Sequence, residues 1–313
     1  MSDNKTVAIL GAGVIGASWA SLFAARGWTL RVYDPAPNAA EALHSYMDTA
    51  WPVLSELGLA TGEKPTSLSV FSSAVEAVKG VSFVQESVPE RLPIKCALFE
   101  TIEPALDPSA VVASSASGLT LSEMQGGWTN PARFVLGHPF NPPHLIPLVE
   151  VMGNAKTDPE AVGVAHQVYR SIGKVTITVQ KEVPGHVANR LQAALWREAI
   201  HLMNEGVASV EDIDTAVWSG PGLRWAAMGP TMLFHLAAGP GGLASFCERY
   251  TDSFNRWWDD LGQVHLTPEI SQHLTAGLEQ EAKGQGQDEL GRQRDALIVA
   301  MLKGMREIRE TQP

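Results

Sequence analysis

Residues 7–37 read VAILGAGVIGASWASLFAARGWTLRVYDPAP, and three glycines lie where an apolar run gives way to a helix-like segment. The run is residues 6–10, the glycines have the spacing G-x-G-x-x-G, and residues 17–25 have a helical composition. In this context the first glycine permits a tight turn, the second lets the backbone approach a pyrophosphate, and the third lets helix and strand pack closely. The helix amides would then point at the anion. The predicted pyrophosphate site comprises Gly11, Gly13, Val14, Ile15 and Gly16.

Asp34 ends the next apolar run, residues 29–33. An acidic side chain about 20 residues past the glycines accepts hydrogen bonds from the adenosine ribose. The following letters, DPAPNAA, contain no Lys or Arg that could neutralise a 2'-phosphate. A glycine turn beside a solvated Asp34 would explain the glycines alone, but strand, helix and acidic residue together favour a cofactor site. The sequence therefore predicts NAD as the cofactor, rather than NADP.

The composition bounds the class of protein. At 313 residues the chain exceeds the usual single domain, and its 45% hydrophobic and 18% charged residues argue against disorder. No apolar run is long enough to predict a membrane span, and MSDNKT lacks a secretory pattern, so we expect a cytoplasmic protein. The net charge of -11 opposes binding to nucleic acid, although a local basic pocket for a phosphorylated ligand stays open. Cys96 and Cys247 belong to no Cys/His cluster, so we predict no disulfide framework and no metal site.

Short β-rich runs alternate with helical stretches up to about residue 180, a pattern typical of a mainly parallel sheet covered on both faces. The expected strands are 6–10, 29–33, 67–71, 81–85, 110–114, 133–137, 147–152 and 174–179, and the expected helices between them are 38–58, 91–105 and 158–171. Beyond Pro184 and Gly185, a plausible hinge, the composition becomes helical, with breaks at SGPGLRW, MGP and AAGPGG. We expect an α/β fold: a Rossmann-type, doubly wound, mainly parallel sheet in residues 1–185, followed by an all-helical domain in residues 186–313.

The segment GHPFNPPHLIPLVEVM, residues 137–152, supplies candidate catalytic groups. His138 lies at the end of an expected strand, on the edge where open α/β sheets bind their ligands, and Glu150 lies in the next apolar run. A histidine can take the proton of an alcohol near neutral pH while its hydride leaves, and a carboxylate can orient the ring and stabilise the imidazolium. Judged by residue type alone, a histidine in a proline-rich turn is more often structural.

The motifs GAGVIG, VPERLPIK, SSASGLTLSE, GHPFNPP, PLVEV and KEVPGHVANR follow one another along the chain. Together they resemble the 3-hydroxyacyl-CoA dehydrogenase superfamily over nearly the whole length. The resemblance implies that His138 is the general base, that Glu150 is its partner, and that the helical region forms a homodimer contact. The other site residues that it implies are Ser117 and Asn189 in catalysis, and Glu90, Lys95, Ser117 and Asn141 beside the cofactor.

Each of these polar residues also has a plainer interpretation. Asn189 is placed to cap a helix after the hinge, Ser117 to bond its own loop, and Glu90 with Lys95 to form an exposed pair. The remaining histidines with no comparable context are expected to be structural or solvated: His144, His186, His201, His235 and His265.

The sequence departs from the acyl-CoA enzymes at residues 220–242, GPGLRWAAMGPTMLFHLAAGPGG, which resemble the short-chain branch that holds L-carnitine dehydrogenase and lambda-crystallin, an L-gulonate dehydrogenase. Arg224 could pair with a carboxylate, and Trp225, Phe140 and Phe234 could face a quaternary ammonium. The alternative is an interface salt bridge and core packing. We expect NAD-dependent oxidation of a small L-3-hydroxy acid, first carnitine-like, then L-gulonate, then a short 3-hydroxyacyl-CoA. A structural NAD-binding protein is the non-enzymatic alternative.

Overall fold

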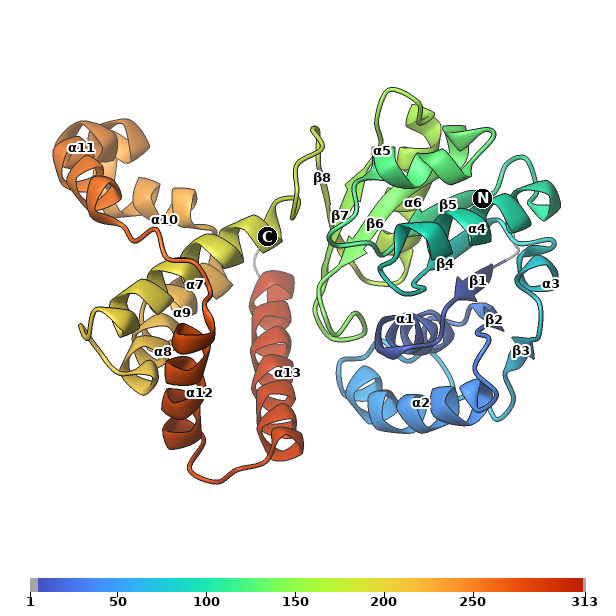
Figure 1. Ribbon diagram of the computed structural model, residues 1–313, viewed down its shortest axis with the longest axis horizontal. Helices are drawn as coiled ribbons and strands as arrows, with labels where there is room; N and C mark the ends of the chain where they lie inside the picture. The colour runs from blue at the N-terminus through green and yellow to red at the C-terminus, as the bar shows by residue number, and fades with distance from the viewer. Residues whose placement is uncertain (1–4, 312–313) are drawn as a thin grey trace. The chain divides into compact units, whose positions relative to one another are not determined.

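The computed structural model describes residues 5–311, and the first part of the chain forms one eight-stranded sheet (Figure 1). The strand order is β3-β2-β1-β4-β5-β6-β7-β8, and every neighbouring pair is parallel except β6 and β7. The order reverses between β1 and β4, as in a doubly wound sheet. The strands are β1 (Thr6–Leu10), β2 (Thr29–Tyr33), β3 (Ser69–Phe71), β4 (Phe83–Glu86), β5 (Val111–Ser114), β6 (Phe134–Pro139), β7 (Leu148–Met152) and β8 (Val175–Thr178).

Alternate side chains of the strands enter two separate hydrophobic cores. On β1, Val7 and Ile9 belong to one core, while Ala8 and Leu10 belong to the other. Both faces of the sheet are therefore covered, which explains the almost uninterrupted apolar character of its strands. The helices over the first core are α1 (Val14–Ala25), α2 (Ala39–Glu56) and α6 (Pro159–Ser171), and those over the second are α3 (Ala74–Val78), α4 (Leu92–Ile102) and α5 (Leu121–Met124).

The predicted fold class is confirmed, and each expected strand is present with ends that differ by at most two residues. The helix expected over 91–105 ends earlier, at Ile102, and Glu103–Ala105 is a 3-10 turn. Pro104 explains the change, because its ring removes an amide donor and clashes with the carbonyl one turn back. Helices α3 and α5 were not predicted, because they are too short to show a helical period in the sequence.

The helices that follow form a second compact unit, which comprises Asn189–Ala296 and the chain from Gly304 onward. The first unit ends at Ala188 and also includes Leu297–Lys303; the expected domain boundary after residue 185 stays a prediction. The predicted breaks are present, and Pro221 and Pro230 each occupy the first position of a helix. The helices are α7 (Ala188–Asn204), α8 (Val210–Ser219), α9 (Pro221–Ala227), α10 (Pro230–Ala237), α11 (Gly242–Asp260), α12 (Pro268–Ala282) and α13 (Gln287–Thr311).

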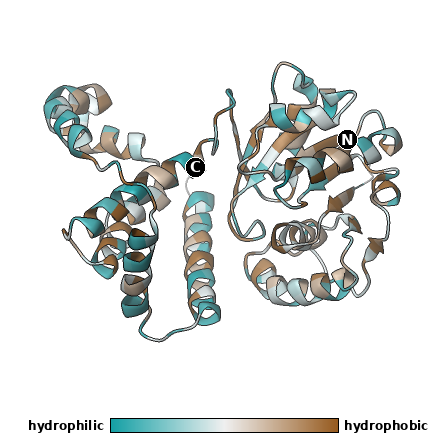
Figure 2. Cartoon of the chain, in the orientation of Figure 1, coloured by the Kyte–Doolittle hydropathy of each residue, from teal (hydrophilic) through white to brown (hydrophobic). Residues whose placement is uncertain are grey.

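Apolar residues recur along the helices of the second unit, interleaved with polar ones (Figure 2). Within residues 5–311, no helix combines the length and the apolarity that crossing a bilayer requires.

A buried polar chain ties α6 to the centre of the sheet. The hydroxyl of Tyr169, a fully buried residue, donates to Gln85 Oε1 at 2.7 Å. The Gln85 amide donates in turn to Ser115 Oγ at 2.9 Å, and the Tyr169 ring stacks on Trp19 of α1. Each buried group in this chain has a partner, as low-dielectric surroundings demand.

We predict that Tyr169→Phe lowers the free energy of unfolding by about 1–3 kcal/mol, because Gln85 Oε1 loses its donor while staying buried. Urea denaturation followed by circular dichroism measures the effect. Tyr250→Phe, at a side chain that is 39% exposed, is the matched control and should change stability by less than about 0.5 kcal/mol. Equal midpoints for the two variants would show that the Tyr169 hydroxyl contributes nothing.

Candidate active site

The glycine turn between β1 and α1 has the geometry that its sequence predicts. Gly11 has a φ of +88°, and a Cβ there would lie 2.7 Å from the Ser87 carbonyl oxygen. A Cβ at Gly16 would lie 1.8 Å from the Gly11 oxygen, so both positions exclude a side chain. Apart from the two neighbours of Gly13 in the chain, no residue among 5–311 has an atom within 4 Å of the place where a Cβ of Gly13 would lie. This open space lets an anionic ligand approach the backbone, so the turn fits the pyrophosphate of a dinucleotide.

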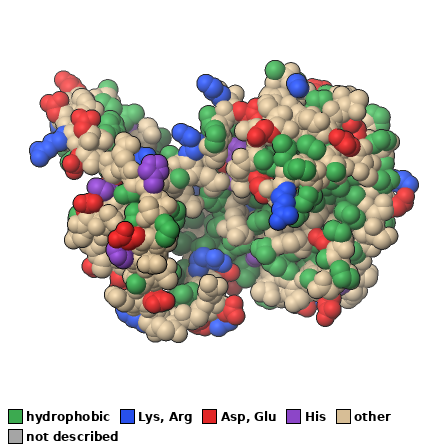
Figure 3. All heavy atoms as spheres, viewed as in Figure 1, with side chains coloured by type: hydrophobic (Ala, Val, Ile, Leu, Met, Phe, Trp, Pro, Cys, Tyr) green, Lys and Arg blue, Asp and Glu red, His purple; other side chains and the backbone are tan. Residues whose placement is uncertain are grey.

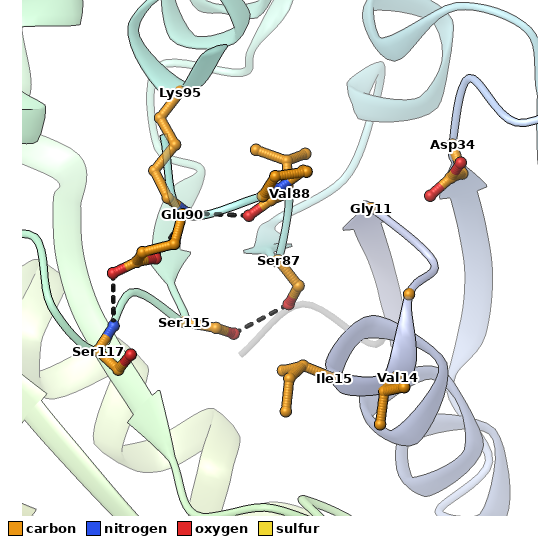
Figure 4. A pocket seen from close by; sticks show the side chains of 12 residues that line it. Gly11, Val14, Ile15, Asp34, Ser87, Val88, Glu90, Lys95, Ser115 and Ser117 are labelled. Atoms are coloured by element: carbon orange, nitrogen blue, oxygen red, sulfur yellow. Dashed lines mark hydrogen bonds and ion pairs between the residues drawn. The ribbon is translucent and has the colours of Figure 1, made fainter. Parts of the chain in front are cut away.

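A cavity extends from this turn along the carboxyl edge of the sheet. Figure 4 shows Asp34 at one end and Glu90 with Ser117 at the other, with Gly11 between them. Asp34 also holds the turn, because its carboxylate accepts from the Ala12 amide at 2.7 Å and from the Ala36 amide at 2.9 Å. The residues that line the cavity are Gly11, Gly13, Val14, Ile15, Asp34, Ser87, Val88, Pro89, Glu90, Lys95, Ser115 and Ser117.

Lys95 makes its shorter ion pair with a residue that the sequence analysis missed. Its ammonium donates to Glu86 Oε1 at 2.7 Å, while Glu90 Oε2 lies 3.7 Å away. Lys95 and Glu86 are both buried, and Glu86 also accepts from the Ser114 hydroxyl and the Val88 amide. A buried carboxylate needs this many donors to offset its desolvation. This ion pair lies where β4 and β5 end, and it holds in place Lys95, which lines the cavity.

Glu90 acts on the neighbouring loop rather than mainly on Lys95. Its Oε1 accepts from three consecutive amides, those of Ser117 at 3.0 Å, Gly118 at 2.8 Å and Leu119 at 3.0 Å. Figure 4 shows the first of these bonds, with the Ser117 side chain beside the cavity. Glu90 therefore sets the backbone position of Ser117.

His138 and Glu150 face each other across the antiparallel pair of β6 and β7. They are direct partners in the register, so their side chains leave the same face of the sheet. His138 Nδ1 lies 2.7 Å from Glu150 Oε2, and both residues are buried. With Glu150 ionised, Nδ1 carries the proton and Nε2 remains to accept another. This is the arrangement of a histidine base oriented by a carboxylate.

The second oxygen of Glu150 binds the chain where it leaves the sheet. Oε1 accepts from the amides of Val187 at 2.8 Å and Ala188 at 3.0 Å, where α7 begins. Burial alone would raise the pKa of Glu150. The hydrogen bonds from His138, Ala188 and Val187 and the charge of His138 outweigh burial, and the pKa is lowered. The carboxylate is thus ionised at every pH at which His138 can act as a base.

His186, expected to be structural or solvated, is buried beside the dyad. Its ring centroid lies 5.2 Å from that of His138, and its Nε2 lies 3.4 Å from the Ala116 carbonyl oxygen. Its φ of +50° marks the turn that leads from the sheet into α7. Burial, followed by the charge that His138 carries when it is protonated, lowers the pKa of His186 and so favours the neutral ring.

The other predicted site residues divide between the two units. Phe140 packs edge-on against His138, with ring centroids 6.0 Å apart, and Asn141 is exposed in the turn after β6. Neither Phe140 nor Asn141 lines the cavity described above. Asn189, Arg224, Trp225 and Phe234 belong to the second unit. Phe234 stacks on Phe246 with centroids 4.6 Å apart. The contacts with substrate or cofactor that the sequence predicts for these six residues stay predictions.

Three polar residues that the sequence analysis missed carry a recognisable signal. Glu86 is the last residue of β4, Ser87 follows it, and Ser115 follows β5. Ser87 Oγ lies 2.9 Å from Ser115 Oγ, and both residues line the cavity. Parallel strands end at one edge of the sheet, so polar residues directly after apolar strands meet there. That rule, applied to every strand, would have found them.

Comparison with known proteins supports this interpretation. Residues 6–183 match the NAD binding domain of 3-hydroxyacyl-CoA dehydrogenase, and residues 185–273 match its C-terminal domain. An L-carnitine dehydrogenase of Nocardiopsis dassonvillei is 45% identical over 97% of this chain and 92% of its own. The L-carnitine dehydrogenase of Pseudomonas putida is 40% identical over 98% and 95%.

Among solved structures, a 5-formyl-3-hydroxy-2-methylpyridine 4-carboxylic acid 5-dehydrogenase, described as an NAD+ dependent dismutase, is similar with a TM-score of 0.83 and 31% identity. The similarity covers 96% of this chain and 98% of that one. The glycine turn, the cavity lined by Asp34 and the two matched domains thus agree: the chain belongs to the 3-hydroxyacyl-CoA dehydrogenase family and is an NAD-dependent dehydrogenase.

Proposed function

We propose that this enzyme oxidises the 3-hydroxyl of a small L-3-hydroxy acid to the 3-oxo acid, with L-carnitine as the first candidate substrate. The observation that carries the proposal is the buried His138–Glu150 pair at the sheet edge that also bears the cofactor cavity. The L-carnitine dehydrogenases that match nearly the whole chain support the choice of substrate. We also propose a cytoplasmic location, where NAD is available.

In this mechanism His138 Nε2 accepts the proton of the substrate hydroxyl. Glu150 holds Nδ1–H and stabilises the imidazolium that forms, without taking the proton itself. The glycine turn and the cavity beside Asp34 would hold NAD+, which would supply the acceptor for the hydride on C3 of the substrate. Because Glu150 is fixed by three donors, the imidazole needs no reorientation during the reaction.

In the proposal, some of the remaining predicted residues hold the cavity in place and the others contact the substrate or the cofactor. Glu90 fixes the Ser117 loop, and the ion pair with Glu86 holds Lys95 in place at the cavity, so these residues act on the cofactor end. We assign Ser117, Asn141 and Asn189 to hydrogen bonds with the reacting oxygen and the nicotinamide carboxamide. The proposal places Phe140, whose ring contacts His138, against the substrate.

We further propose a homodimer formed through the second unit. Most of the exposed large hydrophobic side chains lie in this unit, among them Leu191, Leu195 and Trp196 of α7 and Trp257 and Trp258 of α11. On the face of this unit that Figure 3 shows, hydrophobic side chains lie at the surface between charged ones. A second copy that covers such side chains would remove apolar area from water, which is the main driving force for obligate association.

The substrate proposal predicts the order of activities in a panel of L-carnitine, L-gulonate, L-3-hydroxybutyrate and L-3-hydroxybutyryl-CoA, each offered with NAD. We expect kcat/KM to be highest for L-carnitine, measured by the formation of NADH. Arg224→Lys should raise the KM at least tenfold, about 1.4 kcal/mol, if Arg224 binds the carboxylate bidentately. Trp225→Leu should lower kcat/KM for L-carnitine more than for L-gulonate, because only L-carnitine carries a cation that can bind the face of the Trp225 ring.

Preference for the CoA thioester, with both variants near wild type, would overturn the substrate while leaving the dyad in place. No turnover of any member would favour the structural alternative.

The dyad predicts that His138→Ala and Glu150→Gln each lower kcat by about two to four orders of magnitude, with the dissociation constant for NAD nearly unchanged. The double variant should be little slower than either one, because the two residues form one base. His166→Ala is the matched control, because His166 lies on α6, where its Nε2 is 3.0 Å from Thr178 Oγ1, and takes no part in the dyad. Additive losses would mean that the residues act independently.

The pH dependence has a defined sign. Oxidation should slow as the pH falls and Nε2 of His138 becomes protonated, since it can then accept no further proton. In Glu150→Gln this acid limb should move to lower pH, because the negative charge that stabilises the imidazolium is gone. A rate that is independent of pH across the range in which imidazoles titrate would identify another base.

If the protein is a homodimer, light scattering at micromolar concentration should give a mass twice that of one chain. Replacing both Leu191 and Trp196 of α7 by Glu should shift the protein toward monomer, because the charges would be buried on association. A wild-type monomer with full activity would contradict the proposal.

A further inference from the structure

Lys174, directly before β8, is a buried lysine outside the cofactor cavity. The residue is 6% exposed, and none of the ion pairs among residues 5–311 includes it. Desolvation lowers its pKa to about 7. An amine buried without a carboxylate is unfavourable for stability, so its position calls for an explanation.

The side chain ends among backbone carbonyls of the turn that links β6 to β7. Lys174 Nζ donates to the carbonyl oxygen of Pro143 at 2.6 Å and to that of Ile146 at 2.5 Å. Inside the turn, the amides of Leu145 and Ile146 both bond the Pro142 carbonyl. The carbonyls of Pro143 and Ile146 also need donors, and Lys174 supplies a donor to each of them.

The same side chain contacts the helix that follows the glycine turn. Lys174 Nζ lies 5.2 Å from the centre of the Trp19 ring, and Trp19 Nε1 donates to Ser115 Oγ, at the cavity, at 3.2 Å. The turn meets this helix a second time, because the His144 amide donates to Ser18 Oγ at 2.7 Å. Lys174 thus lies where the β6–β7 turn and α1 meet.

We propose that Lys174 is a positioning residue for the dehydrogenase reaction: its two hydrogen bonds fix the turn that carries Asn141 and joins His138 to Glu150. The inference rests on the proposed function, in which His138 takes the substrate proton, Glu150 orients His138, and Asn141 contacts the reacting groups. A one-residue change in the path of this turn would shift the antiparallel register that sets His138 opposite Glu150.

The chemistry of an amine suits this role in either protonation state. An ammonium has three donors and a neutral amine has two, so both forms satisfy the two carbonyls. The Trp19 ring, whose centroid lies 5.2 Å from Nζ, favours the charged form. The bonds to the turn therefore persist when Lys174 loses its proton.

Lys174→Met tests the proposal, because methionine keeps an unbranched, buried side chain and removes every donor. We expect kcat to fall at least tenfold, with the dissociation constant for NAD changed less than twofold. Hydrogen exchange should become at least tenfold faster in peptides that cover residues 139–148 and stay unchanged over β1. Lys156→Met, an exposed lysine in another turn, is the matched control and should alter neither measurement.

Unchanged exchange over residues 139–148 would overturn the inference without reference to any substrate, so this result is separate from failure of the proposed function. Faster exchange with an unchanged kcat, on whichever hydroxy acid the wild type oxidises, would also overturn it and leave Lys174 a structural residue. If Lys174→Met does not fold, Lys174→Arg keeps the donors and should retain kcat within about threefold; a tenfold loss in this folded variant would count against the proposal.

Discussion

The buried carboxylate of Glu150 is the constraint on which the rest of the site depends. A charge with no exposure to water is tolerated only where donors surround it, and here one imidazole and two backbone amides supply them. The same three bonds determine the orientation of His138 and the path of the chain at Val187 and Ala188. Removal of any one donor would leave part of the charge unsatisfied, so His138, the proposed base, and the start of α7 are linked through a single side chain.

The antiparallel pairing of β7 makes this arrangement possible. In a sheet whose other neighbours are all parallel, a short turn returns the chain beside β6 and sets residues twelve apart in sequence directly opposite each other. A parallel partner would need a crossover connection and could not bring the two side chains together over so short a distance. The turn itself then needs support, and in our proposal Lys174 provides it from the start of β8.

Buried ions at the cofactor end follow the same physical rule. Lys95 and Glu86 neutralise each other below the cavity, and the Ser114 hydroxyl and the Val88 amide complete the carboxylate's partners. Glu90, nearer the solvent, uses its charge to gather three amides of the loop that carries Ser117. The cavity is thus bounded by backbone that charged side chains hold in place, which keeps donors and acceptors oriented before a ligand arrives.

The sequence by itself determined the sheet, the glycine turn and the candidates His138, Glu150 and Asp34, because these depend on local patterns: apolar runs of strand length, glycines at fixed spacing, and polar residues at strand ends. It did not identify Glu86, Ser115, His186 or Lys174. The rule for polar residues at strand ends would have found Glu86 and Ser115, but the contacts of His186 and Lys174 depend on partners far away in the chain, such as Pro143, 31 positions before Lys174. A lysine before a strand has the same local pattern whether it is solvated or buried. Only the tertiary structure, by closing the sheet and its turns around that side chain, decided that its amine meets two carbonyls and, among the described residues, no carboxylate.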